Sequence, residues 1–201
     1  MSFKMRAPEN ILPVERWRVF CAVALPEEVR DRAATHIQTL REAAPKARAS
    51  WPRVESLHIT LKFLGELEAA RVNSLSQAAR RAAKDFQNFE LAIEGAGAFP
   101  PRGMPRVLWL GVKDDSGKLT MLQQRLEEEC AAAGFARETR PFHPHLTIAR
   151  LRAPANSQNL AALHQEIGFE RAAFNVSELL VMRSELGPGG SRFTEISQHV
   201  F

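Results

Sequence analysis

Apolar side chains recur along the chain with two different periods, which predict strands and helices respectively. Helices are expected where apolar positions recur every three or four residues, over residues 27–44, 68–86, 118–133 and 156–167. Strands are expected where β-branched and other apolar residues form short runs or alternate with polar ones. These strand segments are residues 16–25, 57–64, 89–93, 107–112, 144–151, 174–185 and 192–200.

Glycine and proline mark the expected ends and turns of these elements. Gly65 is expected to end the second strand, and the Gly/Pro-rich segment 95–105 is expected to be a loop. The Gly-Pro-Gly-Gly sequence at 187–190 predicts a hairpin between the last two strands. Helices that follow some strands, together with hairpins between others, favour an α+β protein over a doubly wound parallel sheet.

Length and composition restrict the class of protein. The 201 residues suffice for one compact domain or two small lobes that share an interface. We expect a loose N-terminal arm over residues 1–14 and a single domain over residues 15–201. The net charge of +4 is mild, and the basic residues are not gathered in tracts, so an extended duplex-binding surface is not expected.

Cysteine usage and hydropathy give further expectations. Cys21 and Cys130 lie in neither a C-x-x-C pair nor a zinc-like spacing. They predict reduced, buried thiols in a cytoplasmic protein. Neither a metal nor another cofactor is expected. No segment reaches the roughly 18 apolar residues of a membrane span, so no membrane partner is expected.

Two strand segments share the pattern histidine–apolar–threonine–apolar, beginning at His58 and at His145. Because residues two apart in a strand point to the same face, His58 lies beside Thr60, and His145 lies beside Thr147. Two imidazoles and two hydroxyls suit a phosphodiester: one histidine takes a proton from water and the other protonates the leaving oxygen. The repeat hints at an ancient duplication with a pseudo-two-fold axis, although the pattern alone also allows a chance repetition.

Four longer segments support the functional interpretation of this repeat. In chain order they are 18–26 (RVFCAVALP), 57–66 (LHITLKFLGE), 105–112 (PRVLWLGV) and 140–150 (RPFHPHLTIAR). With them, the chain from about residue 17 onwards resembles the two-histidine (2H) phosphoesterases. The resemblance is to the RNA 2',3'-cyclic phosphodiesterases once called 2'-5' RNA ligases, the ThpR or LigT group. It implies a bilobal α+β fold, with two pseudo-symmetric, mostly antiparallel sheets, outer helices and a central cleft.

The resemblance also implies a role for each of the motif residues. His58 is similar to the residue that protonates the leaving oxygen, and His145 to the base that activates water. Thr60 and Thr147 are similar to phosphate contacts. His143 shares the parity of His145 and is expected at most to orient it.

Two further residues are expected in the site from the same resemblance. Arg150 matches a basic residue that holds the phosphate as a bidentate fork. Strict alternation from His145 points Arg150 to the opposite face, so a bulge or a strand end is required between them. Phe20 matches an aromatic residue that stacks on a base, with plain core packing as the alternative.

The implied reaction is metal-independent hydrolysis of an RNA 2',3'-cyclic phosphate to a 2'-phosphomonoester. The expected partners are RNA or nucleotides that carry this cyclic phosphate, and we expect a monomer. Three alternatives stay open: reversible 2'-5' RNA ligation, an RNA- or nucleotide-binding module with little turnover, and a phosphodiesterase for another small 2',5'-linked or cyclic nucleotide.

Overall fold

The computed structural model describes residues 14–152, 156–187 and 190–201. The expected N-terminal arm therefore lies outside the described residues except for Val14, and so do Pro188 and Gly189 of the predicted hairpin turn. The strands are β1 (Arg16–Ala24), β2 (Ala49–Ser50), β3 (His58–Glu68), β4 (Phe89–Phe99), β5 (Val107–Lys113), β6 (His145–Leu151), β7 (Ala172–Val176), β8 (Glu178–Gly187) and β9 (Gly190–Val200). The α-helices are α1 (Glu27–Ala43), α2 (Val72–Ala83), α3 (Lys118–Ala132) and α4 (Ser157–Ile167).

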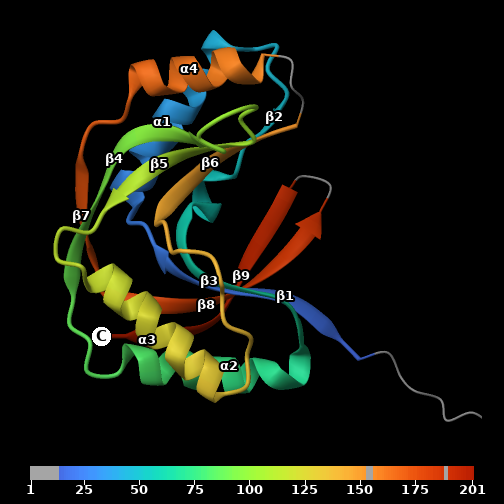
Figure 1. The fold of residues 1–201 in the computed structure, drawn as a ribbon, viewed down its shortest axis with the longest axis vertical. Coiled ribbons are helices and arrows are strands. Elements are labelled where there is room, and N and C mark those ends of the chain that lie inside the picture. Colours follow the sequence, from blue (N-terminus) through green and yellow to red (C-terminus); the bar gives the residue numbers. More distant parts are fainter. Residues whose placement is uncertain (1–13, 153–155, 188–189) are drawn as a thin grey trace, which may run out of the picture.

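The strands form one curled antiparallel sheet with the order β7-β4-β5-β6-β3-β1-β8-β9, and β2 pairs with β6. The two expected sheets correspond to its halves, which meet where a single pair, Ile59 and Leu146, joins β3 to β6. Helices α2 and α3 lie outside the half that contains β1, β3 and β8, whereas α1 and α4 lie outside the half that contains β4, β5 and β6 (Figure 1). The expectation of an α+β fold is confirmed.

The core lies between the outer faces of the sheet and the helices. In α1, the buried apolar residues Val29, Ala33, Ile37 and Leu40 recur at the three- and four-residue spacing that predicted the helix. Leu75 of α2 is fully buried, and its burial contributes about 1.5–3 kcal/mol. Pro26 immediately precedes α1, and Glu27 and Glu28 lie in its first turn. Their negative charges interact favourably with the positive end of the helix dipole.

Two glycine-based boundaries were wrong. Strand β3 runs through Gly65 to Glu68, because Gly65 adopts a φ of +68° beside an irregularity in the pairing with β1. Strand β4 continues to Phe99 through part of the predicted loop, and a register shift lies between Ile93 and Ala96. In both strands the glycine accommodates a bulge and does not end the strand.

The last third of the chain also differs from the prediction. The segment 174–185 was expected to be one strand, but it contributes to two strands separated at Ser177, and β7 and β8 lie in opposite halves of the sheet. The helix expected over residues 68–86 is shorter, spanning Val72–Ala83. The two-residue strand β2 has no apolar periodicity and was not predicted. None of the helices in the described part of the chain is long and apolar enough to cross a membrane.

Candidate active site

The two H-x-T motifs lie on adjacent strands and are related by a local two-fold axis. Ile59 and Leu146, the second residue of each motif, are each other's partners in the antiparallel pairing of β3 with β6. Extending this register sets His58 across from Thr147 and Thr60 across from His145. Both apolar partners are fully buried, whereas the four polar side chains are half-buried. The structure therefore brings together the four residues that the motifs predicted.

Strand β6 contains the bulge that the placement of Arg150 required. Successive alternate residues of β5 pair with His145, Thr147 and Arg150 of β6. Two residues of β6 therefore separate Thr147 from Arg150 where regular pairing allows one, and Ile148 is the additional residue. Alternate residues of a strand share a face, and cross-strand partners do so too. Arg150 consequently projects from the same face as His145, and its side chain is exposed.

Strand β3 contains a bulge at the equivalent position. The partners of alternate residues of β1 are His58, Thr60 and Phe63, which makes Leu61 an additional residue in β3. In both motifs the bulge falls on the third residue after the histidine. The pseudo-symmetry expected from the repeated motif therefore extends to the irregularities of the two strands.

Each histidine is held in the same way by a backbone carbonyl two residues earlier. Nδ1 of His58 lies 2.7 Å from the Ser56 carbonyl oxygen, and Nδ1 of His145 lies 2.8 Å from the His143 carbonyl oxygen. A carbonyl can only accept, so each Nδ1–H donates and fixes the tautomer of its ring. Each Nε2 is left to exchange a proton with substrate. His143 thus orients His145, as expected, but does so through its backbone.

Aromatic rings surround His58. The ring of Phe20 stacks on it with a centroid separation of 4.7 Å, and Phe193 of β9 meets it edge-on at 5.0 Å. Burial lowers the pKa of His58, with further lowering by the positive charges of Arg150 and His145, while the hydrogen bond to Ser56 acts in the opposite direction. The neutral imidazole is therefore favoured in the free site.

Of the two aromatic neighbours of His58, the sequence analysis selected Phe20 as a site residue but not Phe193. Phe20 was expected either to stack on a base or to pack in the core; it is 3% exposed, which fits core packing, and its ring supports His58. Its contact with a base stays a prediction. Phe193 was not selected, because nothing in its local sequence indicates that β9 passes beside the first motif.

His145 has a different environment. The ring of Phe99 meets it edge-on with a centroid separation of 5.2 Å, and Phe99 also contacts Trp109 at 5.3 Å. Phe99 lies in the segment that was predicted to be a loop, so sequence reasoning missed this neighbour. Gly97 permits the arrangement, because a Cβ there would overlap the ring of Trp109.

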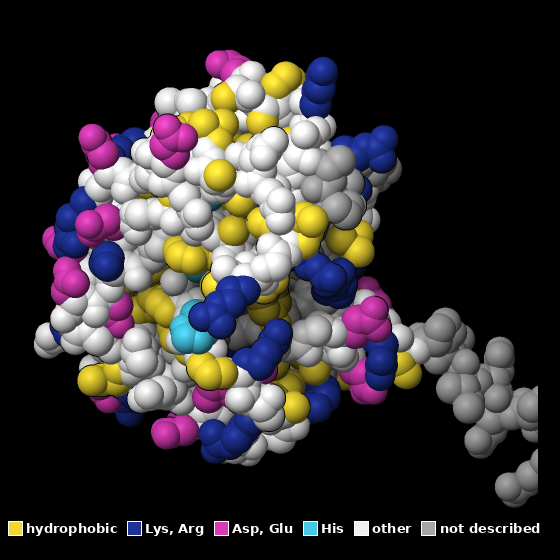
Figure 2. All heavy atoms as spheres, turned by 45° about the horizontal axis from the view of Figure 1, so that its top comes forward, with side chains coloured by type: hydrophobic (Ala, Val, Ile, Leu, Met, Phe, Trp, Pro, Cys, Tyr) yellow, Lys and Arg dark blue, Asp and Glu magenta, His cyan; other side chains and the backbone are white. Residues whose placement is uncertain are grey.

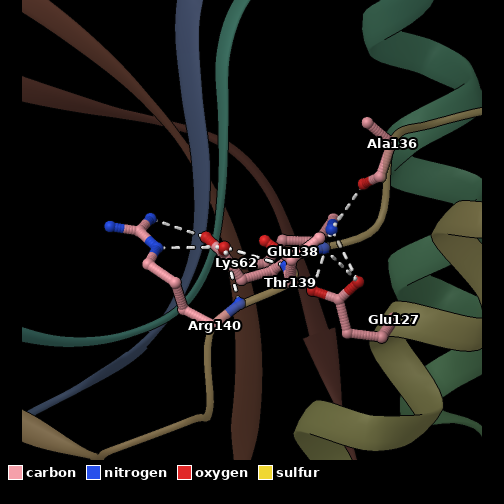
Figure 3. Close-up of polar contacts among 6 residues, drawn as sticks. All are labelled: Lys62, Glu127, Ala136, Glu138, Thr139 and Arg140. Carbon is pink, nitrogen blue, oxygen red and sulfur yellow. Dashed lines mark hydrogen bonds and ion pairs between the residues drawn. The ribbon is translucent and has the colours of Figure 1, made fainter.

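A buried ammonium group connects β3 to the segment that precedes β6. Lys62 lies on the face opposite His58 and donates to both carboxylate oxygens of Glu127, at 2.8 and 2.7 Å, and to the Ala136 carbonyl at 2.9 Å (Figure 3). Glu127 also accepts from the backbone N–H of Glu138. The Glu138 carboxylate accepts from Arg140, and these hydrogen bonds lower the pKa of Glu138 to about 2. The network fixes the chain that leads to His145.

The two helical histidines form a separate pair. Nε2 of His36 lies 2.9 Å from Nδ1 of His164, and Nε2 of His164 lies 3.0 Å from the Trp109 carbonyl oxygen. Because that carbonyl can only accept, His164 donates from Nε2 and accepts at Nδ1 from His36. The two rings therefore bridge α1, α4 and β5 in their neutral forms. None of the contacts of the described residues joins them to His58 or His145.

The charge around the site suits an anion. Figure 2 shows a histidine at the surface beside a hollow, with Lys and Arg side chains gathered next to it. Within residues 14–152, 156–187 and 190–201, no group of three or more His, Cys, Asp and Glu side chains is placed to hold a metal ion. The arrangement offers two acid–base groups, two hydroxyls and a guanidinium, which together can bind and cleave a phosphodiester.

Comparisons with known proteins agree with this geometry. The sequence profile described as the 2'-5' RNA ligase superfamily matches residues 29–188. An RNA 2',3'-cyclic phosphodiesterase of Methanothermobacter thermautotrophicus is 36% identical over 180 residues, covering 89% of this chain and 96% of the relative. One from Escherichia coli is 31% identical, covering 92% and 96%. The crystal structure of E. coli LigT complexed with 3'-AMP has a TM-score of 0.72 at 28% identity, covering 93% of this chain and 99% of that one.

Proposed function

Because this chain belongs to the 2'-5' RNA ligase superfamily, we propose that it is an RNA 2',3'-cyclic phosphodiesterase that leaves a 2'-phosphomonoester. The observation that carries the proposal is the pairing of the two H-x-T strands, with both imidazoles anchored at Nδ1 and available at Nε2. The two relatives named RNA 2',3'-cyclic phosphodiesterase match this chain over 96% of their own length, which supports a hydrolase.

The reaction is a single in-line displacement at phosphorus. His145 accepts a proton from water as the new P–O bond forms, and His58 gives its proton to the 3' oxygen as the P–O3' bond breaks. Thr60 and Thr147 donate to the non-bridging oxygens, and Arg150 balances their negative charge. Each histidine ends in the protonation state from which the other began, so exchange with solvent resets the site.

The lowered pKa of His58 has a consequence for this mechanism. A proton donor must be charged at the start of the reaction, yet burial favours neutral His58 in the free protein. The negative charge of the bound phosphodiester raises the pKa of His58 again, because an adjacent opposite charge favours the imidazolium. Substrate binding is therefore accompanied by proton uptake at neutral pH. Isothermal titration with a non-hydrolysable phosphodiester in buffers of different ionisation enthalpy measures this uptake directly.

Ligation is the second activity that the site supports, because joining a 5'-hydroxyl to a 2',3'-cyclic phosphate replaces water by an alcohol in the same displacement. The name of the 2'-5' RNA ligase superfamily is the reason to consider it. An RNA oligonucleotide that ends in a 2',3'-cyclic phosphate, incubated with and without a 5'-hydroxyl partner strand, separates the outcomes. We expect hydrolysis to dominate. Tight binding without either product would instead indicate a binding module. We also propose that the protein acts as a cytoplasmic monomer.

A further inference from the structure

The backbone carbonyls that hold the two motif histidines are supported differently. The Ser56 carbonyl, which accepts from His58, ends a short 3-10 helix, and Ser56 is buried. The His143 carbonyl, which accepts from His145, lies in residues 133–144, which connect α3 to β6 and belong to no helix or strand of the described structure. His143 itself is exposed. The carbonyl that fixes His145 therefore depends on contacts that anchor this connecting segment from outside.

Lys62 supplies such an anchor from strand β3. An ammonium group has three N–H donors, and Lys62 uses one for each carboxylate oxygen of Glu127, at 2.8 and 2.7 Å, and one for the Ala136 carbonyl, at 2.9 Å (Figure 3). Glu127 in turn accepts from the backbone N–H of Glu138 at 3.3 Å. The side chain of Lys62 is 2% exposed, so all its donors are committed to α3 and to residues 136–138.

The position of Lys62 in β3 connects the two halves of the site. Lys62 follows His58 by four residues, with the additional residue Leu61 between them. Its cross-strand partner is Cys21, which is fully buried, so the ammonium group lies on the core side of the sheet. Lys62 therefore joins the strand of one histidine to the segment that holds the other, without reaching the face that carries His58.

Stability alone does not account for an ion pair at this place. Burial of an ammonium and a carboxylate costs solvation energy, and well-packed apolar side chains of similar volume are often at least as stabilising. The neighbouring residues Ile59 and Leu61 of the same strand are apolar and buried. Apolar contacts are not directional, whereas three N–H bonds from one nitrogen fix the places of three oxygen atoms. The ion pair therefore suits a requirement for position.

We propose that Lys62 is a positioning residue for the reaction: by fixing residues 136–138 it sets the place of the His143 carbonyl, and thereby the tautomer and direction of the His145 imidazole. This inference rests on the proposed function, in which His145 accepts the proton of water at Nε2. When the carbonyl moves away, Nδ1–H of His145 loses its partner, and Nε2 carries the lone pair for only part of the time. Phe142 packs against the core at the other end of the segment, so the loss is graded.

The double variant Lys62→Met/Glu127→Leu separates positioning from stability, because apolar side chains replace the whole ion pair. We expect its unfolding in urea to be close to that of the parent protein. We expect kcat for a cyclic-phosphate RNA to fall about 10- to 100-fold, because the base is misplaced. KM should stay within about twofold, since the hydroxyls and the guanidinium that bind phosphate are unchanged. A double variant with the parent kcat would overturn the proposal.

The tautomer of His145 is measured without turnover. Long-range ¹H–¹⁵N NMR spectra, recorded at a pH where the rings are neutral, report which nitrogen of each histidine carries the proton. We expect the Nδ1–H form for His145 in the parent protein and a mixture of tautomers in the double variant. His58 is the internal control and should be unchanged, because the Ser56 carbonyl lies outside the network. An unchanged His145, or an equal change at His58, would overturn the proposal.

These readouts distinguish the role of Lys62 from the proposed function. If the parent protein opens no cyclic-phosphate RNA, the proposed function fails, and the NMR comparison still decides the role of Lys62. If the double variant does not recover stability, kcat and the spectra are measured for Lys62→Met well below its unfolding temperature. Leu75→Ala is then the matched control, because Leu75 is a fully buried residue of α2 outside the network, and its truncation also destabilises the fold. An equal loss of kcat in Leu75→Ala would overturn the proposal.

Discussion

The buried pair His36–His164 predicts that the protein loses stability as the pH falls below neutrality. His164 is fully buried and His36 is 7% exposed, and the hydrogen bonds that join them to Trp109 use the neutral forms of both rings. Burial, with a smaller effect from the charge of His164, lowers the pKa of His36 from 6.5 to about 4. Burial also lowers the pKa of His164.

The sign and size of the effect follow from proton linkage. Between pH 6.5 and about 4 the unfolded chain binds a proton at His36 that the folded chain does not, so unfolding becomes easier as the pH falls. With these two pKa values, His36 alone removes about 2 kcal/mol between pH 7 and pH 5. The lowered pKa of His164 adds a loss in the same direction. Such a loss is a large part of the 5–15 kcal/mol typical of a folded domain.

The assay is urea unfolding at pH 7 and at pH 5 for the parent protein and for His36→Gln. Glutamine keeps a donor near the position of Nε2 but does not titrate. We expect the difference in unfolding free energy between the two pH values to shrink by about 2 kcal/mol in His36→Gln. His143→Ala is the control, because His143 is exposed and should leave the difference unchanged. An unaltered pH dependence in His36→Gln would show that protonation of the buried pair does not destabilise the fold.

Three further predictions concern the proposed catalytic pair, His58 and His145, and its support. His58→Ala and His145→Ala should each abolish most turnover, and the double variant should be little worse, because the two rings act as one unit; near-normal rates in either single variant would contradict the assignment. Excess EDTA should leave the rate unchanged, and a large loss restored by Mg²⁺ or Mn²⁺ would contradict acid–base catalysis by the two histidines. Lys62→Met should lower the free energy of unfolding in urea by about 3–5 kcal/mol, because Glu127 keeps a largely buried charge without its partner. The double variant Lys62→Met/Glu127→Leu should recover most of this loss. Equal losses in the single and double variants would argue against a paired-charge effect.

The sequence predicted the parts of the site that depend on local periodicity. The alternation of His58 and Thr60 in an apolar strand sufficed to place both on one face, and the same holds for the second motif. The need for a bulge before Arg150 also followed from parity, and the register of β6 confirms it. These are properties of single strands, in which the side-chain period is fixed by the backbone.

The rest depends on contacts between distant segments. Phe193 reaches His58 from the last strand, and His36 pairs with His164 across two helices that are far apart in sequence. Lys62 occurs in an apolar run, and only the partner Glu127 on α3 explains its burial. Glycines misled the boundaries of β3 and β4, because a bulge and a strand end use the same residue type.

We propose that the two paired H-x-T strands open a 2',3'-cyclic phosphate with the 3' oxygen as the leaving group. Which oxygen departs is set by how the ribose is oriented between His58 and His145, since only the oxygen beside the acid is protonated. Phosphorus NMR of the product formed from 2',3'-cyclic AMP in the presence of EDTA tests this most directly. We expect a 2'-phosphomonoester as the predominant product. A predominantly 3'-phosphate product, or no conversion at all, would contradict it.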